Sequence, residues 1–236
     1  MKSHIYTIFA LMISNINCST CIIKSSAAKA LSTEQLNALG KNCVQIDFKK
    51  GDVIFKEGTF SVNITYLRKG IVKLHTEGKT SQILKIAKGP RYLGIPTTFE
   101  EKINHYSATA LEDCHVCFIH TNIFKTFIEE NKKFAYEIIV ELCNSELELF
   151  QKCVSRTKNN VYGRLAHALL FFKEKIYESE SFSLPLSREE FGNFINTTRE
   201  SVSRVLAELD SKKIIQIKGR QIKVLKTEVL RELSVI

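Results

Sequence analysis

Residues 187–211 read SREEFGNFINTTRESVSRVLAELDS and set the architecture of the C-terminal part of the chain. A serine followed three residues later by a glutamate, here Ser187 and Glu190, is typical of a helix N-cap with a capping box. Asn196-Thr197-Thr198 interrupts this first helix. A second helix is predicted over residues 199–211, with one apolar face formed by Val202, Val205, Leu206 and Leu209. The stretch therefore predicts two short helices joined by a tight turn.

The sequence on either side of this helix pair predicts a third helix and a β-hairpin. Residues 161–172 have the spacing of an amphipathic helix, and residues 184–186 form a short predicted strand. Residues 214–217 and 221–225 bracket Lys218-Gly219-Arg220, which is typical of a hairpin with a basic tip. Helix, turn, helix and hairpin in this order predict a winged helix-turn-helix.

The start of the second helix carries side chains suited to reading base edges. In a helix-turn-helix, this helix enters the major groove with its N-terminal residues toward the bases. Arginine donates two parallel hydrogen bonds to guanine, and a carboxylate accepts one from cytosine. The predicted DNA-binding set is Thr198, Arg199, Glu200, Ser203 and Arg204, joined by Ser187, Lys218 and Arg220. The alternative is an exposed helix whose arginines only pair with Glu200.

The charge of the chain favours an anionic partner. The 236 residues hold 34 Lys and Arg against 25 Asp and Glu, for a formal net charge of +9. Residues 156–236 hold 15 of the basic residues against 10 acidic ones. We expect double-stranded DNA as the partner, ahead of a membrane surface. The sequence has no run of 18 apolar residues that would span a membrane.

Upstream, residues 43–120 show short apolar runs separated by glycine turns. Several runs alternate apolar and polar residues, as half-buried strands do. This pattern predicts an antiparallel β-barrel or jelly roll with strands over 44–48, 52–55, 64–67, 71–74, 82–86 and 114–119. A small helix with capping-box character, over residues 32–39, precedes it.

Between residues 123 and 152 the apolar period changes to that of a helix. A narrow apolar stripe on a helix of this length favours packing against a second copy of the chain. We therefore predict a homodimer seam made of Phe134, Ile138, Leu142, Ser145 and Leu149. The alternative is a helix that packs into the core of its own chain.

Three motifs in this arrangement resemble the CRP/FNR superfamily of bacterial transcription regulators, over about residues 18 to 230. The most specific is Arg199-Glu200-Ser201-Val202-Ser203-Arg204, which combines the reading sets of the nucleotide-dependent and oxygen-sensor branches. Residues 50–58, KGDVIFKEG, resemble the family's barrel hairpin. Residues 163–166, GRLA, resemble its first C-terminal helix.

The resemblance implies an α+β protein in four parts. These are an N-terminal arm, a cyclic-nucleotide-binding-like β-barrel or jelly roll, a dimerisation helix and a winged helix-turn-helix, over residues 1–30, 31–122, 123–155 and 156–236. It also implies a homodimer that binds inverted-repeat DNA, with half-sites near TGTGA or TTGAT, and RNA polymerase as a protein partner.

The nucleotide-binding cassette of the family is altered in this sequence. Family members that bind a cyclic nucleotide place a glutamate after a glycine and, further on, an arginine before a serine or threonine. Here Gly94 is followed by Ile95, and Tyr106 precedes Ser107. Without the guanidinium, the phosphate loses its strongest charge-assisted contact. We therefore expect an effector other than a cyclic nucleotide.

The cysteines suggest a different sensory chemistry. Oxygen sensors of the family hold an iron–sulfur cluster with an N-terminal C-x2-C-x5-C motif and one barrel cysteine. Cys18 and Cys21 match the first pair and Cys117 matches the barrel position, but an alanine stands at the third position. A four-thiolate cluster would then need Cys43 or Cys114 as a substitute. A thiol switch, a haem held by Cys or His, and no redox role at all are the alternatives.

The N-terminal residues and the cysteine count bear on the cellular compartment. Residues 5–16 are fairly apolar and follow Lys2, as in a signal peptide. Asn15 and Asn17 do not suit signal cleavage, so we interpret the segment as an apolar arm. Seven cysteines without regular spacing argue against a secreted disulfide framework and favour the cytoplasm.

The sequence contains none of the common catalytic motifs. H-E-x-x-H, a P-loop and a nucleophile elbow are all missing, which argues against an enzyme. The alternative to a DNA-binding regulator is a redox, iron–sulfur or haem sensor whose output is a protein partner.

Overall fold

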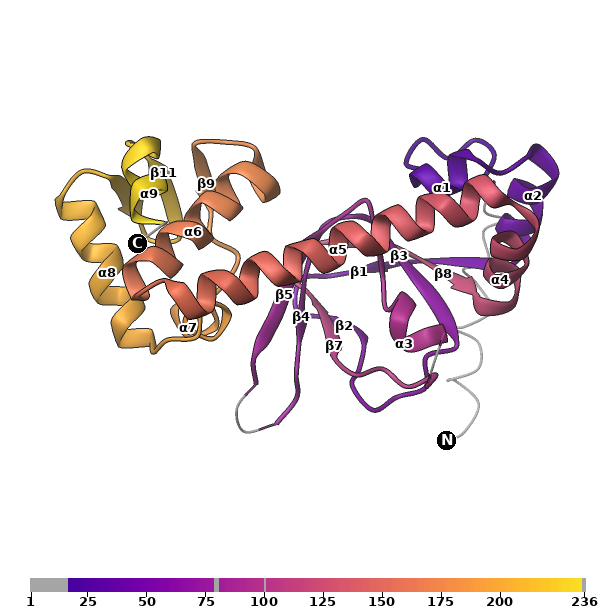
Figure 1. Ribbon diagram of the computed structural model, residues 1–236, viewed down its shortest axis with the longest axis horizontal. Coiled ribbons are helices and arrows are strands. Elements are labelled where there is room, and N and C mark those ends of the chain that lie inside the picture. Colours follow the sequence, from indigo (N-terminus) through magenta and orange to yellow (C-terminus); the bar gives the residue numbers. More distant parts are fainter. Residues whose placement is uncertain (1–16, 79–80, 100, 235–236) are drawn as a thin grey trace, which may run out of the picture.

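The computed structural model describes residues 17–78, 81–99 and 101–234, and it shows an elongated molecule (Figure 1). A β-sheet domain and a C-terminal domain lie at opposite ends, joined by the long helix α5 (Lys132–Lys158). The apolar segment over residues 5–16, interpreted as an arm, lies outside the described residues.

The β-sheet domain consists of two antiparallel four-stranded sheets. One has the order β1 (Cys43–Phe48), β8 (Cys114–His120), β3 (Asn63–Lys69), β6 (Arg91–Leu93). The other has the order β2 (Val53–Phe55), β7 (Ser107–Ala110), β4 (Ile71–His75), β5 (Ile83–Lys88). The predicted jelly roll is confirmed, as two sheets and not as a closed barrel. The strands β6 and β7 were not predicted from the sequence.

Four short helices surround these sheets: α1 (Ser26–Lys29), α2 (Thr33–Lys41), α3 (Ile95–Phe99) and α4 (Thr121–Glu130). The capping box predicted before α2 is present, because Ser32 and Gln35 exchange both hydrogen bonds. The prediction of one continuous helix from residue 123 is wrong in one respect, since the chain forms two helices with a break between α4 and α5. At the break, Asn131 accepts a hydrogen bond from the Phe134 amide at 3.0 Å and so caps the start of α5.

The C-terminal domain begins with α6 (Val161–Phe171), which continues into a π-helical turn (Phe172–Tyr177). It then contains β9 (Ser181–Ser183), α7 (Arg188–Ile195), α8 (Arg199–Ser211), β10 (Ile215–Lys218), β11 (Gln221–Val224) and α9 (Thr227–Leu233). The short strand lies at residues 181–183 and not at the predicted 184–186. Leu184 and Leu186 instead belong to the core, where both are buried.

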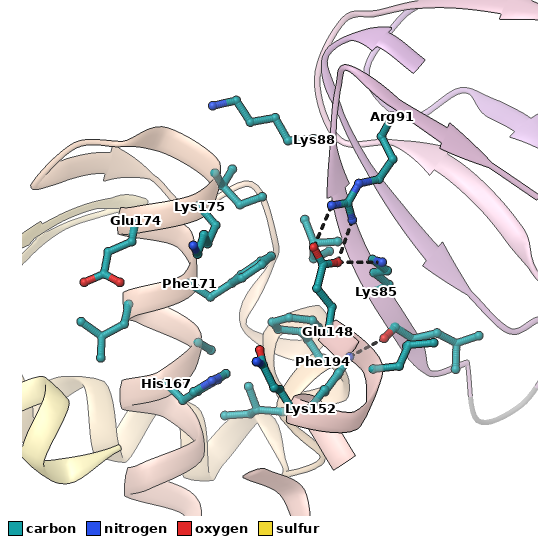
Figure 2. A pocket seen from close by; sticks show the side chains of 18 of the residues that line it. Lys85, Lys88, Arg91, Glu148, Lys152, His167, Phe171, Glu174, Lys175 and Phe194 are labelled. Carbon is teal, nitrogen blue, oxygen red and sulfur yellow. Dashed lines mark hydrogen bonds and ion pairs between the residues drawn. The ribbon is translucent and has the colours of Figure 1, made fainter. Parts of the chain in front are cut away.

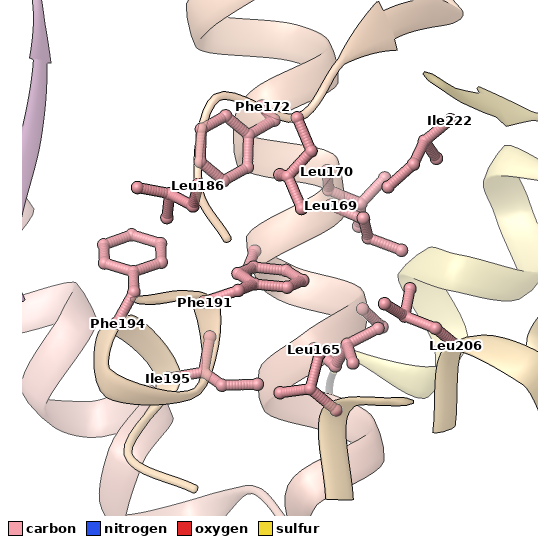
Figure 3. Close-up of a cluster of buried hydrophobic side chains, with 14 of the residues drawn as sticks. Leu165, Leu169, Leu170, Phe172, Leu186, Phe191, Phe194, Ile195, Leu206 and Ile222 are labelled. Atoms are coloured by element: carbon pink, nitrogen blue, oxygen red, sulfur yellow. The ribbon is translucent and has the colours of Figure 1, made fainter. Parts of the chain in front are cut away.

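The core of this domain holds the two helices of the helix-turn-helix against α6. The centre of this core includes four fully buried side chains, which are Leu165, Phe172, Phe191 and, from α8, Leu206 (Figure 3). The inward face predicted for α8 is confirmed, since Val202, Val205, Leu206 and Leu209 are all buried. Burial of one stripe fixes which face of α8 remains at the surface.

The two domains also contact each other. Ile71 and Ile83 of the β-sheet domain belong to the same buried cluster as the C-terminal core. The ammonium group of Lys73 on β4 lies 2.6 Å from the carboxylate of Glu190 on α7. The first helix of the helix-turn-helix is therefore held against the sheet that would carry a sensory site.

Candidate DNA-binding surface and sensory sites

The turn between α7 and α8 depends on a glycine. Asn196 adopts the left-handed conformation that ends α7, and the Thr197 amide donates to the Gly192 carbonyl at 2.9 Å. A Cβ atom on Gly192 would lie 2.6 Å from the Thr197 carbonyl oxygen. Only glycine lets the chain turn this closely, and the turn sets the angle at which α8 leaves the domain.

Arg164 holds the same turn from α6. Its guanidinium donates to the carbonyls of Ile195 at 2.9 Å, Asn196 at 3.3 Å and Asn159 at 2.8 Å. Sequence reasoning missed this role, because Arg164 was recognised only as part of the GRLA motif. A rigid fork of donors that satisfies three carbonyls fixes the turn relative to α6.

The N-terminal half of α8 presents a polar, unobstructed face. Arg199, Glu200, Ser203 and Arg204 are exposed, while the Thr198 hydroxyl caps the helix by accepting from the Ser201 amide at 3.2 Å. Over the described ranges, neither arginine forms an ion pair with Glu200 or with any other residue. The salt-bridged alternative is therefore not what the structure shows, and both guanidinium groups are free to meet a ligand.

The other predicted DNA contacts lie at the start of α7 and at the tip of the β10–β11 hairpin. Ser187 is engaged in the capping box, accepting from the Glu190 amide at 3.1 Å. Lys218 and Arg220 are exposed at the tip of the β10–β11 hairpin, where Gly219 has a φ of +62°. Burial and the charge of Arg220 both lower the pKa of Arg188 on α7. The hairpin tip and the start of α7 thus form one basic edge.

The dimer seam predicted on α5 needs correction. Phe134 and Ile138 are only 1% and 3% exposed, because they pack into the core beneath the first sheet. The ring of Phe134 lies 5.2 Å from that of Phe124 on α4, measured between centroids. Leu142 packs on the same cluster. At Phe134 and Ile138 this side of α5 is therefore intramolecular, whereas Leu142 is only partly buried.

For the remaining two seam residues, Ser145 and Leu149, the dimer contact stays a prediction. The Ser145 hydroxyl accepts a hydrogen bond from Lys85 of β5 at 2.7 Å, and Leu149 is half exposed beside that contact. A different set of apolar side chains lies at the surface of α5, each between 51% and 64% exposed. We call it the outer stripe, and it comprises Tyr136, Ile139, Leu147, Phe150 and Val154.

The altered nucleotide cassette carries side chains that pack or hydrogen-bond within the chain. Ile95 is buried, and the ring of Tyr106 packs on Phe55 with centroids 5.8 Å apart. Ser107 donates to the Glu77 carboxylate at 2.6 Å and accepts from the Glu57 amide at 3.0 Å. The cassette positions therefore present a hydrocarbon and a phenol where a nucleotide needs an acid and a guanidinium.

Three of the predicted redox cysteines meet under the first sheet. Cys43 interacts with both Cys18 and Cys117, and the pKa of Cys43 is raised by these two neighbours and by burial. The hydrogen bond from Cys43 and two nearby basic side chains lower the pKa of Cys18 to about 7, against the effect of burial. Cys18 thus has substantial thiolate character at neutral pH.

The thiol cluster does not fit a metal centre as it stands. A cubane cluster normally takes four thiolates. Within the described ranges, no group of three or more His, Cys, Asp or Glu side chains is arranged to hold a metal ion. Cys21 is half buried and takes no part in the hydrogen bonds around Cys43. We therefore assign no iron chemistry to these residues.

Two known protein families match separate parts of the chain. Residues 45–131 match the cyclic nucleotide-binding domain, and residues 163–233 match the Crp-like helix-turn-helix domain. Among the helices of the described residues, none has the length and apolar character that a membrane span requires.

Individual relatives match this chain over most of its length. The chain is 27% identical to the fumarate and nitrate reduction regulatory protein of Vibrio cholerae, covering 79% of this chain and 76% of that one. It is 25% identical to the nitrogen fixation regulation protein FixK of Bradyrhizobium diazoefficiens, covering 82% and 83%.

Solved structures agree on the fold. The structure of FixK2 from Bradyrhizobium japonicum superposes with a TM-score of 0.74 at 18% identity, over 82% of this chain and 98% of that one. A CRP/FNR family transcriptional regulator from Thermus thermophilus superposes with a TM-score of 0.69 at 21% identity, over 80% and 97%.

Proposed function

The chain belongs to the CRP/FNR family of transcription regulators, and on this premise we propose that it binds an inverted-repeat operator as a homodimer and reads its sequence with α8. The observation that carries the proposal is the exposed face at the start of α8. Its two arginines and one glutamate are held by a buried opposite face, yet they have no partners among the described residues. Exposed charged groups that form no ion pairs within the protein are suited to hydrogen bonding with base edges.

In the proposed complex, each side chain has a separate task. Arg204 and Glu200 face one G·C pair, with the guanidinium on guanine and the carboxylate on cytosine. Arg199 reaches a second guanine, and Ser203 contacts a neighbouring base or phosphate. Ser187, Lys218 and Arg220 contact phosphates, which strengthens binding to any sequence.

Dimerisation is proposed to use the outer stripe of α5. Tyr136 and Phe150 are two heptads apart, and Leu147 and Val154 are one heptad apart. Apolar residues with this repeat form the contact line of a two-stranded coiled coil. A second copy of α5 would cover side chains that one chain leaves at its surface, and it would place two α8 helices on half-sites about 34 Å apart.

The sensory input and cellular setting follow from the same premise. We propose that the protein works in the cytoplasm, is not an enzyme, acts on RNA polymerase, and responds to an effector other than a cyclic nucleotide. Ile95 and Tyr106 support the last point, because neither supplies a charged contact to ribose or phosphate.

Selection from random DNA tests the assignment of α8. The Arg204→Ala variant should lose about 1–3 kcal/mol on the selected site and relax preference at one base pair. The Arg220→Ala variant is the matched control, because it removes the same charge at the hairpin tip. It should weaken all sequences alike and lower the salt dependence by about one contact. An unchanged preference in the Arg204→Ala variant would refute α8 as the reading element.

The alternative, a sensor whose output is a protein partner, predicts a different result. A shift assay on DNA upstream of the protein's own gene, with competitor DNA and several salt concentrations, separates the two. The regulator should retain a specific complex at a competitor excess that removes non-specific binding. A sensor without a DNA output should lose every complex together.

A further inference from the structure

A cavity of about 780 Å³ lies where the β-sheet domain, α5 and the C-terminal domain meet. Strands β5 and β6 line one side of it, α5 contributes its C-terminal half, and α6 lines the other side (Figure 2). The volume is typical of a site for a small molecule. The nucleotide cassette, at Gly94, borders a different and smaller cavity of about 240 Å³.

The lining of this interdomain cavity is positively charged. Among the described residues that line it, seven are Lys or Arg and three are Glu. Glu148 is already bound by both guanidinium nitrogens of Arg91 at 2.7 Å and by Lys85 at 2.8 Å. Burial raises the pKa of Glu148, but these hydrogen bonds outweigh it and lower the value to about 2. The carboxylate is thus fully neutralised, and the surplus of positive charge remains for a ligand.

The cavity also has an apolar side. Phe171 of α6 and Phe194 of α7 line it, and the Lys152 ammonium lies 4.2 Å from the centroid of the Phe194 ring. Lys175, one turn beyond Phe171, also lines the cavity, and its exposed ammonium forms no ion pair within the described ranges (Figure 2). Burial lowers the pKa of His167 on the same side, so this ring is neutral at pH 7.

We propose that this cavity binds a small organic anion, with a flat apolar body against Phe171 and Phe194 and a carboxylate, sulfonate or phosphate toward Lys175. Such a ligand would contact β5 and β6 on one side and α6 on the other, so it bridges the two domains. On the proposed function, it would then favour one orientation of the winged helix and change operator affinity.

Fluorescence titration of the full chain with 8-anilinonaphthalene-1-sulfonate tests the site without any DNA. This probe joins an aromatic body to one sulfonate, and we expect one saturable site per chain. The Lys175→Glu variant should raise the dissociation constant at least about tenfold, because attraction becomes repulsion. The Lys41→Glu variant makes the same charge change at the far end of the molecule, in the last turn of α2, and should bind within about twofold of the parent.

Competition experiments define the ligand class. Naphthalene-2-sulfonate should displace the probe, whereas inorganic sulfate at equal ionic strength should not, because it lacks the apolar body. Equal affinity of the Lys175→Glu and Lys41→Glu variants, or equal competition by sulfate, would overturn the proposal.

Operator affinity measured with and without naphthalene-2-sulfonate tests the coupling between domains. A change in the parent protein that disappears in the Lys175→Glu variant supports it. Probe binding together with an unchanged operator affinity would refute the coupling. If the protein bound no operator at all, the proposed function would be refuted. The fluorescence titration would still show whether the interdomain cavity binds the anion, because it needs no DNA.

Discussion

Helices α8 and α5 both leave one face at the surface, but the two faces differ in chemistry. The exposed face of α8 carries arginine, glutamate and serine, whereas the outer stripe of α5 carries aromatic and aliphatic side chains. An exposed charged face suits an anionic, hydrogen-bonding partner such as DNA. A contiguous exposed apolar face is typical of a contact with another apolar surface. The composition of each exposed face therefore indicates the class of partner.

The two faces of α5 also differ from each other, and the largest expected effect tests that difference. Phe134→Ala removes a ring that is packed against Phe124 and Phe127 within one chain. We expect a loss of about 3–5 kcal/mol in the free energy of unfolding, measured with urea. The adjacent, exposed Lys133→Ala should change it by less than about 0.5 kcal/mol. A small effect of Phe134→Ala would mean that the inner face is not core.

Leu147→Lys tests the outer stripe in the same helix. In a dimer it would place two like charges in an apolar contact, so the dimer dissociation constant should rise about 100-fold, which corresponds to roughly 3 kcal/mol. Sedimentation should show a folded monomer, and circular dichroism should be unchanged. Leu225→Lys, the same change at another exposed leucine, should leave the oligomeric state intact. A Leu147→Lys dimer of normal stability would contradict the proposed contact.

Thr198→Ala tests whether the N-cap of α8 stabilises the first turn of this helix, where the exposed charged face begins. The hydroxyl of Thr198 accepts from the Ser201 amide, so its removal should cost about 1 kcal/mol of helix stability. Amide hydrogen exchange at Ser201 should become faster, and operator binding should weaken. Thr198→Ser keeps the acceptor and should retain most of the stability. Equal exchange rates in both variants would show that this cap contributes nothing to α8.

The smallest effect concerns the thiols beneath the inner face of α5. Because the pKa of Cys18 is lowered to about 7, its alkylation by iodoacetamide should reach half its maximal rate near pH 7 and level off above about pH 8. In the Cys43→Ala variant the hydrogen-bond donor is missing, so the midpoint should move to higher pH. Mass spectrometry of the labelled peptide measures both. An identical midpoint in the two proteins would remove Cys43 as the cause.

Comparison of α8 with α5 also shows why one helix could be predicted and the other only in part. In α8 the apolar residues lie on one face, so their period identifies the buried side and, by exclusion, the exposed side. In α5 apolar residues occupy two faces. The period at Phe134 and Ile138 was recognised correctly, but it describes contacts with the chain's own sheet and not with a second copy.

Other features could not be predicted because they depend on contacts between distant segments. The guanidinium of Arg164 donates to two carbonyls of the turn after α7, and these lie 31 and 32 positions further along the chain. The meeting of Cys18, Cys43 and Cys117 depends on how β1 and β8 pair, which residue spacing alone does not determine. The interdomain cavity is formed by segments from both domains, so no single segment indicates it.

The continuous helix α5 makes the geometry of the whole molecule sensitive to the length of the chain. Its 27 residues span about 40 Å, and each residue turns the helix by about 100°. Insertion of one residue near its C-terminal end would advance the winged helix by only about 1.5 Å, yet it would rotate the exposed face of α8 by more than a quarter of a turn relative to the β-sheet domain. Insertions and deletions in α5 should therefore be more disruptive than substitutions at its exposed positions, because the continuous helix fixes the angle between the two ends of the protein.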